Sequence, residues 1–168
     1  MEPQKHSDLR KALYRKLRHL RVFGSSFGCF GAIAIVGLIS QMSGNLLLVP
    51  SFGASSVIMA TIPDSAFAQP RSIVFGHFVS SLAGLLCLMI FGQEWWSIAL
   101  AVGGSAGLMQ LTRTLHPPAA ADPILFMQGG MGWHALFSTV LAGSIVLVLY
   151  FYVFNNWIAR RPYPKYWI

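Results

Sequence analysis

Long apolar runs separated by short polar breaks make up most of this chain. Four runs are uninterrupted, and each approaches the roughly 20 residues that a helix needs to cross a bilayer. They are residues 22–41, 72–91, 95–111 and 134–154. Two further apolar stretches, residues 45–62 and 113–124, contain prolines and polar residues. The pattern predicts an all-α integral membrane protein in which full transmembrane helices flank broken segments.

The second broken segment contains the Pro117-Pro118 pair. Proline disfavours helical geometry in the residue before it, so the chain up to Pro117 is expected to be extended. Pro118 suits the first position of a helix, and Ala119, Ala120 and Ala121 continue that helix well. An extended stretch that turns into a short helix near Pro118 is therefore predicted.

The first broken segment has the same design. Pro50 interrupts its apolar run, Ser51 is placed to cap a short helix, and Pro63 with Asp64 ends that helix. Two broken segments in corresponding places suggest a duplicated architecture.

The two halves of the chain also resemble each other in order. Residues 22–91 and 95–154 each run full helix, broken strand-plus-half-helix segment, full helix, and the stretch that begins at His77 is echoed by the one at His134. This order predicts two inverted repeats. The alternative architecture is four transmembrane helices with two re-entrant half-helices.

Charge placement favours the inverted repeats. If each broken segment crosses the membrane, there are six crossings, and the outer loops are residues 42–44, 92–94 and 128–132. None of these loops contains lysine or arginine, and basic residues concentrate on the cytoplasmic side of membrane proteins. We therefore expect a bacterial inner-membrane protein with both termini in the cytoplasm.

Composition agrees with a membrane protein: 55% of the 168 residues are hydrophobic, 10% are charged, and the mean hydropathy is +0.59. The net charge of +7 comes mostly from the two ends of the chain. No basic and aromatic face accompanies that charge, so nucleic-acid binding is not expected. The expected domains are a basic amphipathic segment on anionic lipid (1–21), one transmembrane domain (22–154) and a cytoplasmic tail (155–168).

Inverted repeats would bring the N-termini of the two short helices together near the middle of the membrane. Each N-terminus carries about half a positive charge and unpaired N–H donors, which predicts an anion site. Small residues would let a ligand approach the backbone, and two hydroxyls would donate to it. The candidate residues are Gly53, Ala54, Ser55, Ser56, Pro118, Ala119, Ala120 and Ala121.

Three histidines lie within the apolar part of the chain. A neutral imidazole at His116 can donate to an anion or accept a co-transported proton, or it can cap backbone freed by the prolines. His77 and His134 either line the pathway or hydrogen-bond between helices.

Two arginines also lie between the apolar runs. Arg113 either attracts the anion or pairs with Asp122 or the membrane interface. Arg71 either lines the pathway or belongs to an ordered turn near Asp64.

The motifs Leu115-His-Pro-Pro-Ala119, Pro50-Ser-Phe-Gly-Ala-Ser55 and Pro63-Asp-Ser-Ala-Phe-Ala-Gln-Pro-Arg71 closely resemble the HPP family of integral membrane proteins, named for its His-Pro-Pro triplet. The resemblance covers residues 22–154. Plastid and cyanobacterial members are associated with nitrite transport, so the resemblance implies a small monovalent oxyanion as the passenger.

Two other function classes stay open. Buried histidines and aspartates are residue types that could bind the metal ion of a membrane-embedded metalloenzyme. The spacing argues against this function, because it puts no two of these residues on one helical face. A membrane subunit that only anchors partners would leave the polar motifs unexplained. We expect a transporter that is not an enzyme, has no cofactor and assembles as a homodimer.

Overall fold

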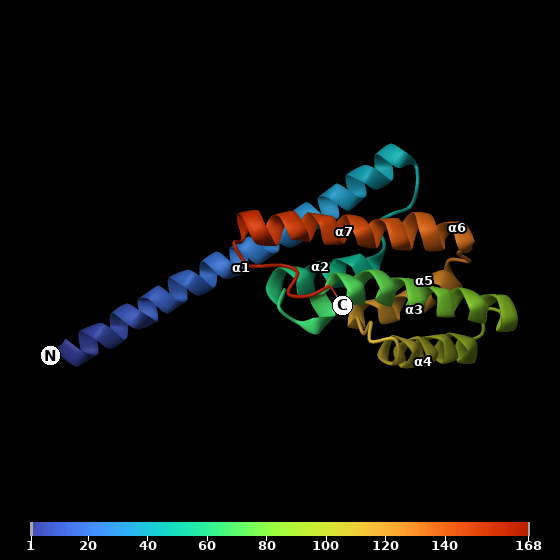
Figure 1. Ribbon diagram of the computed structural model, residues 1–168, viewed down its shortest axis with the longest axis horizontal. Helices are drawn as coiled ribbons and strands as arrows, with labels where there is room; N and C mark the ends of the chain where they lie inside the picture. The colour runs from blue at the N-terminus through green and yellow to red at the C-terminus, as the bar shows by residue number, and fades with distance from the viewer. Residues whose placement is uncertain (1, 168) are drawn as a thin grey trace.

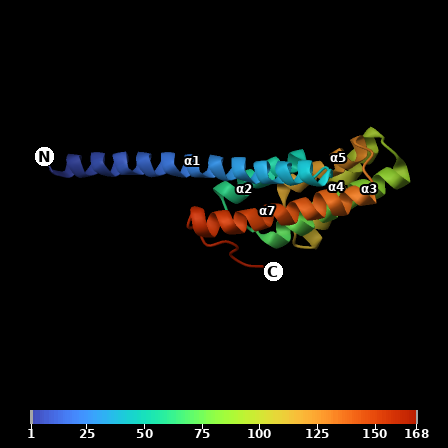
Figure 2. The same cartoon turned by 90° about the horizontal axis from the view of Figure 1, so that it is seen from above.

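The computed structural model describes residues 2–167, with side chains from His19 onward. Within that part of the chain the structure is helical and contains no strand. The first helix, α1 (Glu2–Ser43), is one straight helix whose N-terminal half projects away from the bundle (Figures 1 and 2). A separate surface helix was expected over residues 1–21. The backbone differs from this expectation, because the helix continues without a break into the following span. The amphipathic face proposed for residues 5–18 lies outside the described side chains.

The remaining elements follow in short succession. They are α2 (Pro50–Thr61), η1 (Ala66–Ala68), α3 (Pro70–Phe91), α4 (Trp95–Leu111), η2 (Pro117–Ala121), α5 (Asp122–Gln128), α6 (Trp133–Ala135), η3 (Leu136–Leu141), α7 (Ala142–Val153) and η4 (Phe154–Ile158). The last four form one continuous helical segment with π-helical turns at η3 and η4.

Three helices in the described chain are long and apolar enough to cross a membrane: His19–Ser43, Pro70–Phe91 and Trp133–Ile158. Helix α4 has 17 residues, which rise about 26 Å and fall slightly short of a hydrocarbon core of about 30 Å. Three of the four predicted full spans are thus long enough, and α4 has its predicted bounds but is slightly short for a full span.

Chain direction alternates along the long axis of the molecule. In Figure 1 the chain runs rightward along α1, returns along α2, runs rightward again along α3 and returns along α4. Helix α5 then runs rightward, and the last helical segment returns.

Both broken segments form short helices, as predicted, but each begins at a proline slightly before the expected starts at Ser51 and Pro118. The N-cap of α2 is the extended residue Val49, two residues before the predicted cap at Ser51, and the helix starts at Pro50. The second segment starts at Pro117 after the extended residue His116, and it opens as a 3₁₀-helix. In both cases the fixed φ of proline at the first helical position sets the start.

Small residues on α3 position the second broken segment. Gly76, Ser80 and Gly84 are four residues apart and share one helical face. A Cβ atom at Gly84 would lie 2.6 Å from the Cα of Pro123. Ser80 Oγ donates to the carbonyl of Ala119 at 2.6 Å. The backbone of η2 and α5 therefore lies directly on α3.

The C-terminal tail folds back onto the connection between α2 and α3. The hydroxyl of Tyr163 donates to the carbonyl of Ala68 at 2.8 Å, and the backbone N–H of Lys165 donates to Gln69 Oε1 at 2.9 Å. Lys165 also pairs with Asp64 at 3.1 Å. Because Tyr163 is 2% exposed, burial raises the pKa of its phenol. The predicted tail is thus a packed part of the structure.

Candidate functional site

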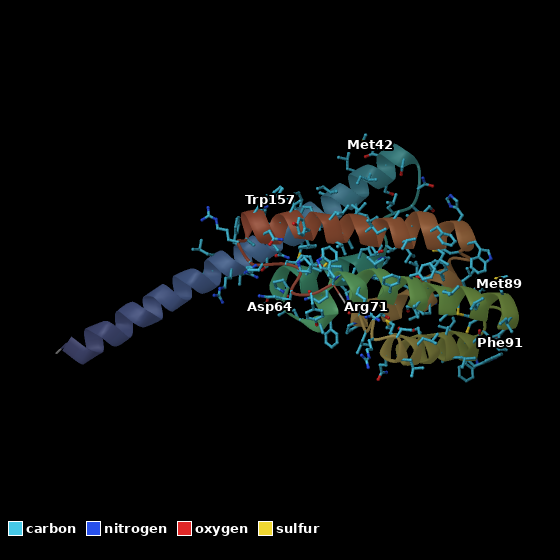
Figure 3. All side chains as sticks on the ribbon, in the orientation of Figure 1. Met42, Asp64, Arg71, Met89, Phe91 and Trp157 are labelled. Carbon is cyan, nitrogen blue, oxygen red and sulfur yellow. The ribbon has the colours of Figure 1, made fainter. Side chains whose placement is uncertain are left out.

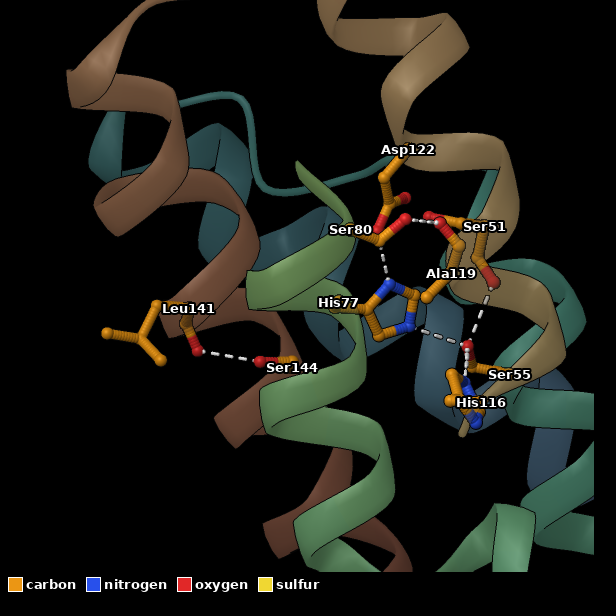
Figure 4. A network of polar contacts seen from close by, with 9 residues as sticks. All are labelled: Ser51, Ser55, His77, Ser80, His116, Ala119, Asp122, Leu141 and Ser144. Carbon is orange, nitrogen blue, oxygen red and sulfur yellow. Dashed lines mark hydrogen bonds and ion pairs between the residues drawn. The ribbon is translucent and has the colours of Figure 1, made fainter. Parts of the chain in front are cut away.

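Four polar side chains from different elements meet inside the bundle (Figure 4). They are Ser55 on α2, His77 on α3, His116 just before η2, and Asp122 at the start of α5, and none is more than 1% exposed. We call these four residues the polar cluster. It assembles residues that are up to 67 positions apart in the sequence, since 122 − 55 = 67.

Hydrogen bonds join the polar cluster into one chain. Asp122 Oδ2 lies 2.7 Å from His77 Nδ1, and His77 Nε2 lies 2.9 Å from Ser55 Oγ. Ser55 Oγ lies 2.7 Å from His116 Nε2, and His116 Nδ1 lies 2.6 Å from the carbonyl oxygen of Phe67. Both nitrogens of both imidazoles are therefore engaged.

The broken segments bring these side chains together. Ser55 is in the second turn of α2, which faces the start of η2, and His116 is held extended by Pro117. Asp122 lies at the N-terminus of α5, where the helix dipole favours a carboxylate. The ring of Phe52 packs edge-on against His77, with centroids 5.0 Å apart. An apolar wall thus covers a charged or strongly polar centre.

Two atoms at the cluster have no hydrogen-bond partner among the described residues: Asp122 Oδ1 and Ser51 Oγ. Both residues are almost fully buried, at 1% and 3% exposure. Buried polar atoms normally find a partner. The cluster therefore offers one free carboxylate acceptor and one free hydroxyl to a small polar ligand or a water molecule.

The predicted N–H donors at the two helix N-termini are fewer than the sequence analysis assumed. Pro50, Pro117 and Pro118 carry no N–H. The N–H of Phe52 bonds to the Val49 carbonyl at 3.1 Å, and that of Ala119 bonds to the His116 carbonyl at 3.0 Å. Side chains, more than backbone amides, provide the polar groups at this site.

Of the two predicted serine hydroxyls, one reaches the cluster. Ser56 Oγ donates to the carbonyl of Gly53 within its own helix, at 2.7 Å. Ala54 is exposed, and an added Cβ at Gly53 would meet no atom within 4 Å. Gly53, Ala54 and Ser56 therefore lie on other faces of α2, because neighbouring helical residues point about 100° apart.

The alanines of η2 divide in the same way. Ala119 is fully buried and its carbonyl accepts from Ser80, whereas Pro118 and Ala120 are half-buried and Ala121 is exposed. Only Ala119 contributes directly to the walls of the site.

Arg113 lies outside the polar cluster. It has a left-handed backbone, with φ of 56°, and its N–H bonds to the Gln110 carbonyl while that of Thr114 bonds to the Met109 carbonyl. These two bonds form a Schellman turn that ends α4. The suggested pairing with Asp122 is wrong, because Asp122 bonds to His77.

Arg71 and His134 are also away from the cluster. Arg71 donates to the carbonyl of Thr112 at 3.0 Å, and Asp64, labelled near it in Figure 3, pairs with Lys165 instead. His134 is exposed at the start of α6 and contacts Ser138, one turn further along its own helix. The matching of His134 to His77 in the two halves does not extend to their surroundings.

Asp122 was expected only as an ion-pair partner of Arg113 and not as part of the site. No role was expected for the Phe67 carbonyl or for Ser80. Two features of the sequence could have pointed to these residues. Asp122 lies in the same broken segment as His116, and Ser80 is four residues from both Gly76 and Gly84.

Comparisons with known proteins agree with the fold. Residues 15–164 match the family described as HPP, transmembrane region. A transmembrane protein of Dictyostelium discoideum is 36% identical over 129 residues, which cover 72% of this chain and 45% of that relative. A second transmembrane protein of the same organism is 31% identical over 130 residues, covering 73% of this chain and 42% of that relative. The chain thus spans less than half the length of these two relatives, and no solved structure matches it. The match over most of the chain places it in the HPP family of integral membrane proteins.

Proposed function

We propose that the protein transports a small monovalent anion, nitrite or a similar oxyanion, across a membrane. The polar cluster is the observation that carries this proposal: Ser55, His77, His116 and Asp122 are fully buried between apolar helices. Ionisable groups at membrane depth are costly and mark substrate or proton pathways. A protein that only anchored partners would gain nothing from them.

The charges around the cluster suit an anion. The N-terminus of α2 carries a partial positive charge, and Ser51 at that end has a hydroxyl without a partner in the described chain. If the imidazole of His77 carries two protons, its charge balances that of Asp122, whose Oδ2 lies 2.7 Å from His77 Nδ1. A small anion near Ser51 would then meet the positive end of the helix dipole without an unbalanced carboxylate beside it.

The alternating chain direction supports six membrane passages, made by four longer helices and two broken segments. In this arrangement the basic ends of the chain lie on one side of the membrane, which we propose is the cytoplasmic side of a bacterial inner membrane. We further propose a homodimer, since the outward face of α4 exposes Gly103 and Gly104 for close helix packing.

Anion flux into liposomes containing the purified protein tests the proposal, with Ser55→Ala and Ser56→Ala as a matched pair. Loss of the Ser55 hydroxyl removes two contacts in the cluster, so flux should fall by about tenfold or more. Ser56→Ala removes one hydrogen bond inside α2 and should leave flux within about twofold. Equal effects in the two variants, or no flux with any small anion, would contradict a transport site at the cluster.

A serine hydrolase is a second candidate, because Asp122, His77 and Ser55 are arranged in the order of a catalytic triad. Ser55 is poorly placed as a nucleophile, however. Its Oγ is fully buried, donates to or accepts from His116, and bonds to the Ser51 carbonyl at 3.0 Å. We therefore favour transport.

A fluorophosphonate probe distinguishes these two functions, since it labels activated serine nucleophiles. If the protein is a transporter, Ser55 is not an activated nucleophile. The wild-type protein and Ser55→Ala should then show the same labelling. Labelling that depends on both Ser55 and His77 would establish the hydrolase instead.

A further inference from the structure

The Ser55 hydroxyl contacts more hydrogen-bond acceptors than it can satisfy. His77 Nε2, His116 Nε2 and the Ser51 carbonyl oxygen lie 2.9, 2.7 and 3.0 Å from Ser55 Oγ. A hydroxyl has one proton to donate and can otherwise only accept. At least one of the two imidazole nitrogens must therefore carry a proton and donate it to Ser55.

His116 is the less suitable of the two histidines to carry that proton. Its Nδ1 lies 2.6 Å from the Phe67 carbonyl, which can only accept, so Nδ1 already holds a proton. A second proton on Nε2 would make His116 a buried cation, and its hydrogen-bond partners are a carbonyl and a hydroxyl. Burying a charge without an opposite charge is costly.

His77 is suited to carry the proton, because its other nitrogen faces Asp122 at 2.7 Å. With Nε2 protonated, His77 donates to Ser55, Ser55 donates to His116 Nε2 in place of the more distant Ser51 carbonyl, and His116 donates to the Phe67 carbonyl. Every donor in the chain then has an acceptor. The proton shared by His77 and Asp122 leaves the pair neutral overall, whether it is written as imidazolium and carboxylate or as imidazole and carboxylic acid.

We propose that the polar cluster stores one exchangeable proton on the His77–Asp122 pair, and that the protein moves its anion together with this proton. The coupling rests on the transport function proposed above; the stored proton does not. Release of the proton removes hydrogen from His77 Nε2, leaving two imidazole lone pairs around one hydroxyl. One hydrogen bond of the chain is then lost, so the cluster opens when the proton leaves.

The groups that face His77 are few. Ser55 comes from α2, His116 from the segment before η2, Asp122 from α5, and the ring of Phe52 closes the fourth side. Arg71 bonds to the Thr112 carbonyl and Arg113 is exposed, whereas His77 is fully buried. The Asp122 carboxylate is thus the negative charge that stabilises the additional proton on the His77–Asp122 pair.

Nitrogen-15 NMR of the histidine-labelled protein in detergent tests the stored proton without any transport. At neutral pH we expect His77 to carry hydrogen on Nε2 and His116 to carry it on Nδ1 only. His77→Gln assigns the first signal, and His134→Gln serves as a control outside the cluster. Asp122→Asn should remove the extra proton. Two cluster histidines without hydrogen on Nε2 would overturn the inference.

Liposomes containing a pH-sensitive dye and a nitrite gradient test the coupling. We expect about one proton to enter with each anion, and we expect a pH gradient alone to drive anion accumulation. In Asp122→Asn this accumulation should fall by about tenfold or more, because the carboxylate that holds the proton is gone. Anion flux without proton movement in the wild type would overturn the coupling and leave the transport function standing. Absence of any flux, with hydrogen still present on His77 Nε2, would overturn both the transport function and the coupling, while supporting the stored proton.

Discussion

Gly76 on α3 lies directly against His116: a Cβ atom added at Gly76 would come within 2.8 Å of His116 Cβ and 2.7 Å of the Thr114 carbonyl oxygen. Such distances are well below ordinary van der Waals contact. The backbone that carries His116 can therefore approach α3 only because residue 76 has no side chain. The position of one cluster histidine depends on a glycine of a neighbouring helix.

Gly76→Ala should accordingly destabilise the protein by about 1–3 kcal/mol, because the helix and the His116 segment must move apart. Gly104→Ala is the matched control, since an added Cβ at Gly104 meets no atom within 4 Å. That control should be neutral or should stabilise by up to about 1 kcal/mol through helix propensity. Thermal unfolding of both variants in the same detergent measures the difference, and equal melting temperatures would contradict the close packing.

His116→Ala should reduce anion flux far more than it reduces the yield of folded protein. The change removes two hydrogen bonds, to Ser55 and to the Phe67 carbonyl, but adds no clash. Flux in liposomes, normalised to monodisperse protein from size-exclusion chromatography, is the appropriate measurement. A parallel fall in flux and folded yield would indicate that the imidazole only supports the fold.

Arg113→Gly separates two roles of the arginine at the end of α4. A left-handed backbone costs most residues about 1 kcal/mol and glycine very little. If the residue only completes the Schellman turn, the variant should match or slightly exceed the wild type in melting temperature and retain its flux. If its charge attracts the anion, flux should fall and the apparent KM should rise at low ionic strength.

Tyr163→Phe should loosen the C-terminal tail. It removes the hydrogen bond to the Ala68 carbonyl, which is worth about 1 kcal/mol. Trypsin should then cleave after Lys165 faster than in the wild type. Tyr166→Phe is the control, because Tyr166 is 46% exposed, and its cleavage rate should not change.

Raised pH should have the same effect on the tail as Tyr163→Phe. Burial raises the pKa of the Tyr163 phenol, so the folded tail favours the neutral form. Its stabilising contribution is complete below the ordinary tyrosine pKa of about 10 and is lost as pH rises further. Trypsin sensitivity should therefore increase above about pH 10 in the wild type and change less in Tyr163→Phe.

The sequence predicted the elements better than it predicted their contacts. Proline at positions 50 and 117 determines where two short helices begin, and that rule is local. The Asp122–His77 contact joins residues 45 positions apart, and no local rule predicts it. Ser55 and His116 lie in motifs that break apolar runs, and the structure brings these two predicted site residues within 2.7 Å of each other.

The errors have equally physical causes. Ser56 was expected beside Ser55, but adjacent helical residues point in different directions, and its hydroxyl bonds to its own helix. Pairing with Asp122 was one of the expected roles of Arg113, but Asp122 bonds to His77, which is a tertiary contact that no local pattern reveals. The length of α1 was misjudged because a basic surface and a transmembrane run can share one uninterrupted helix.

The connection between α2 and α3 has a practical consequence for work with the purified protein. Two successive carbonyls in it serve different regions: Phe67 accepts from His116 in the cluster, and Ala68 accepts from Tyr163 in the tail. An affinity tag or fluorescent fusion joined after Ile168 would begin five positions after Tyr163, close to the residues that hold this connection. The N-terminal end of α1 projects away from the bundle. Labels placed there should leave this connection undisturbed, so the N-terminally tagged protein should have a melting temperature at least as high as that of the C-terminally tagged protein.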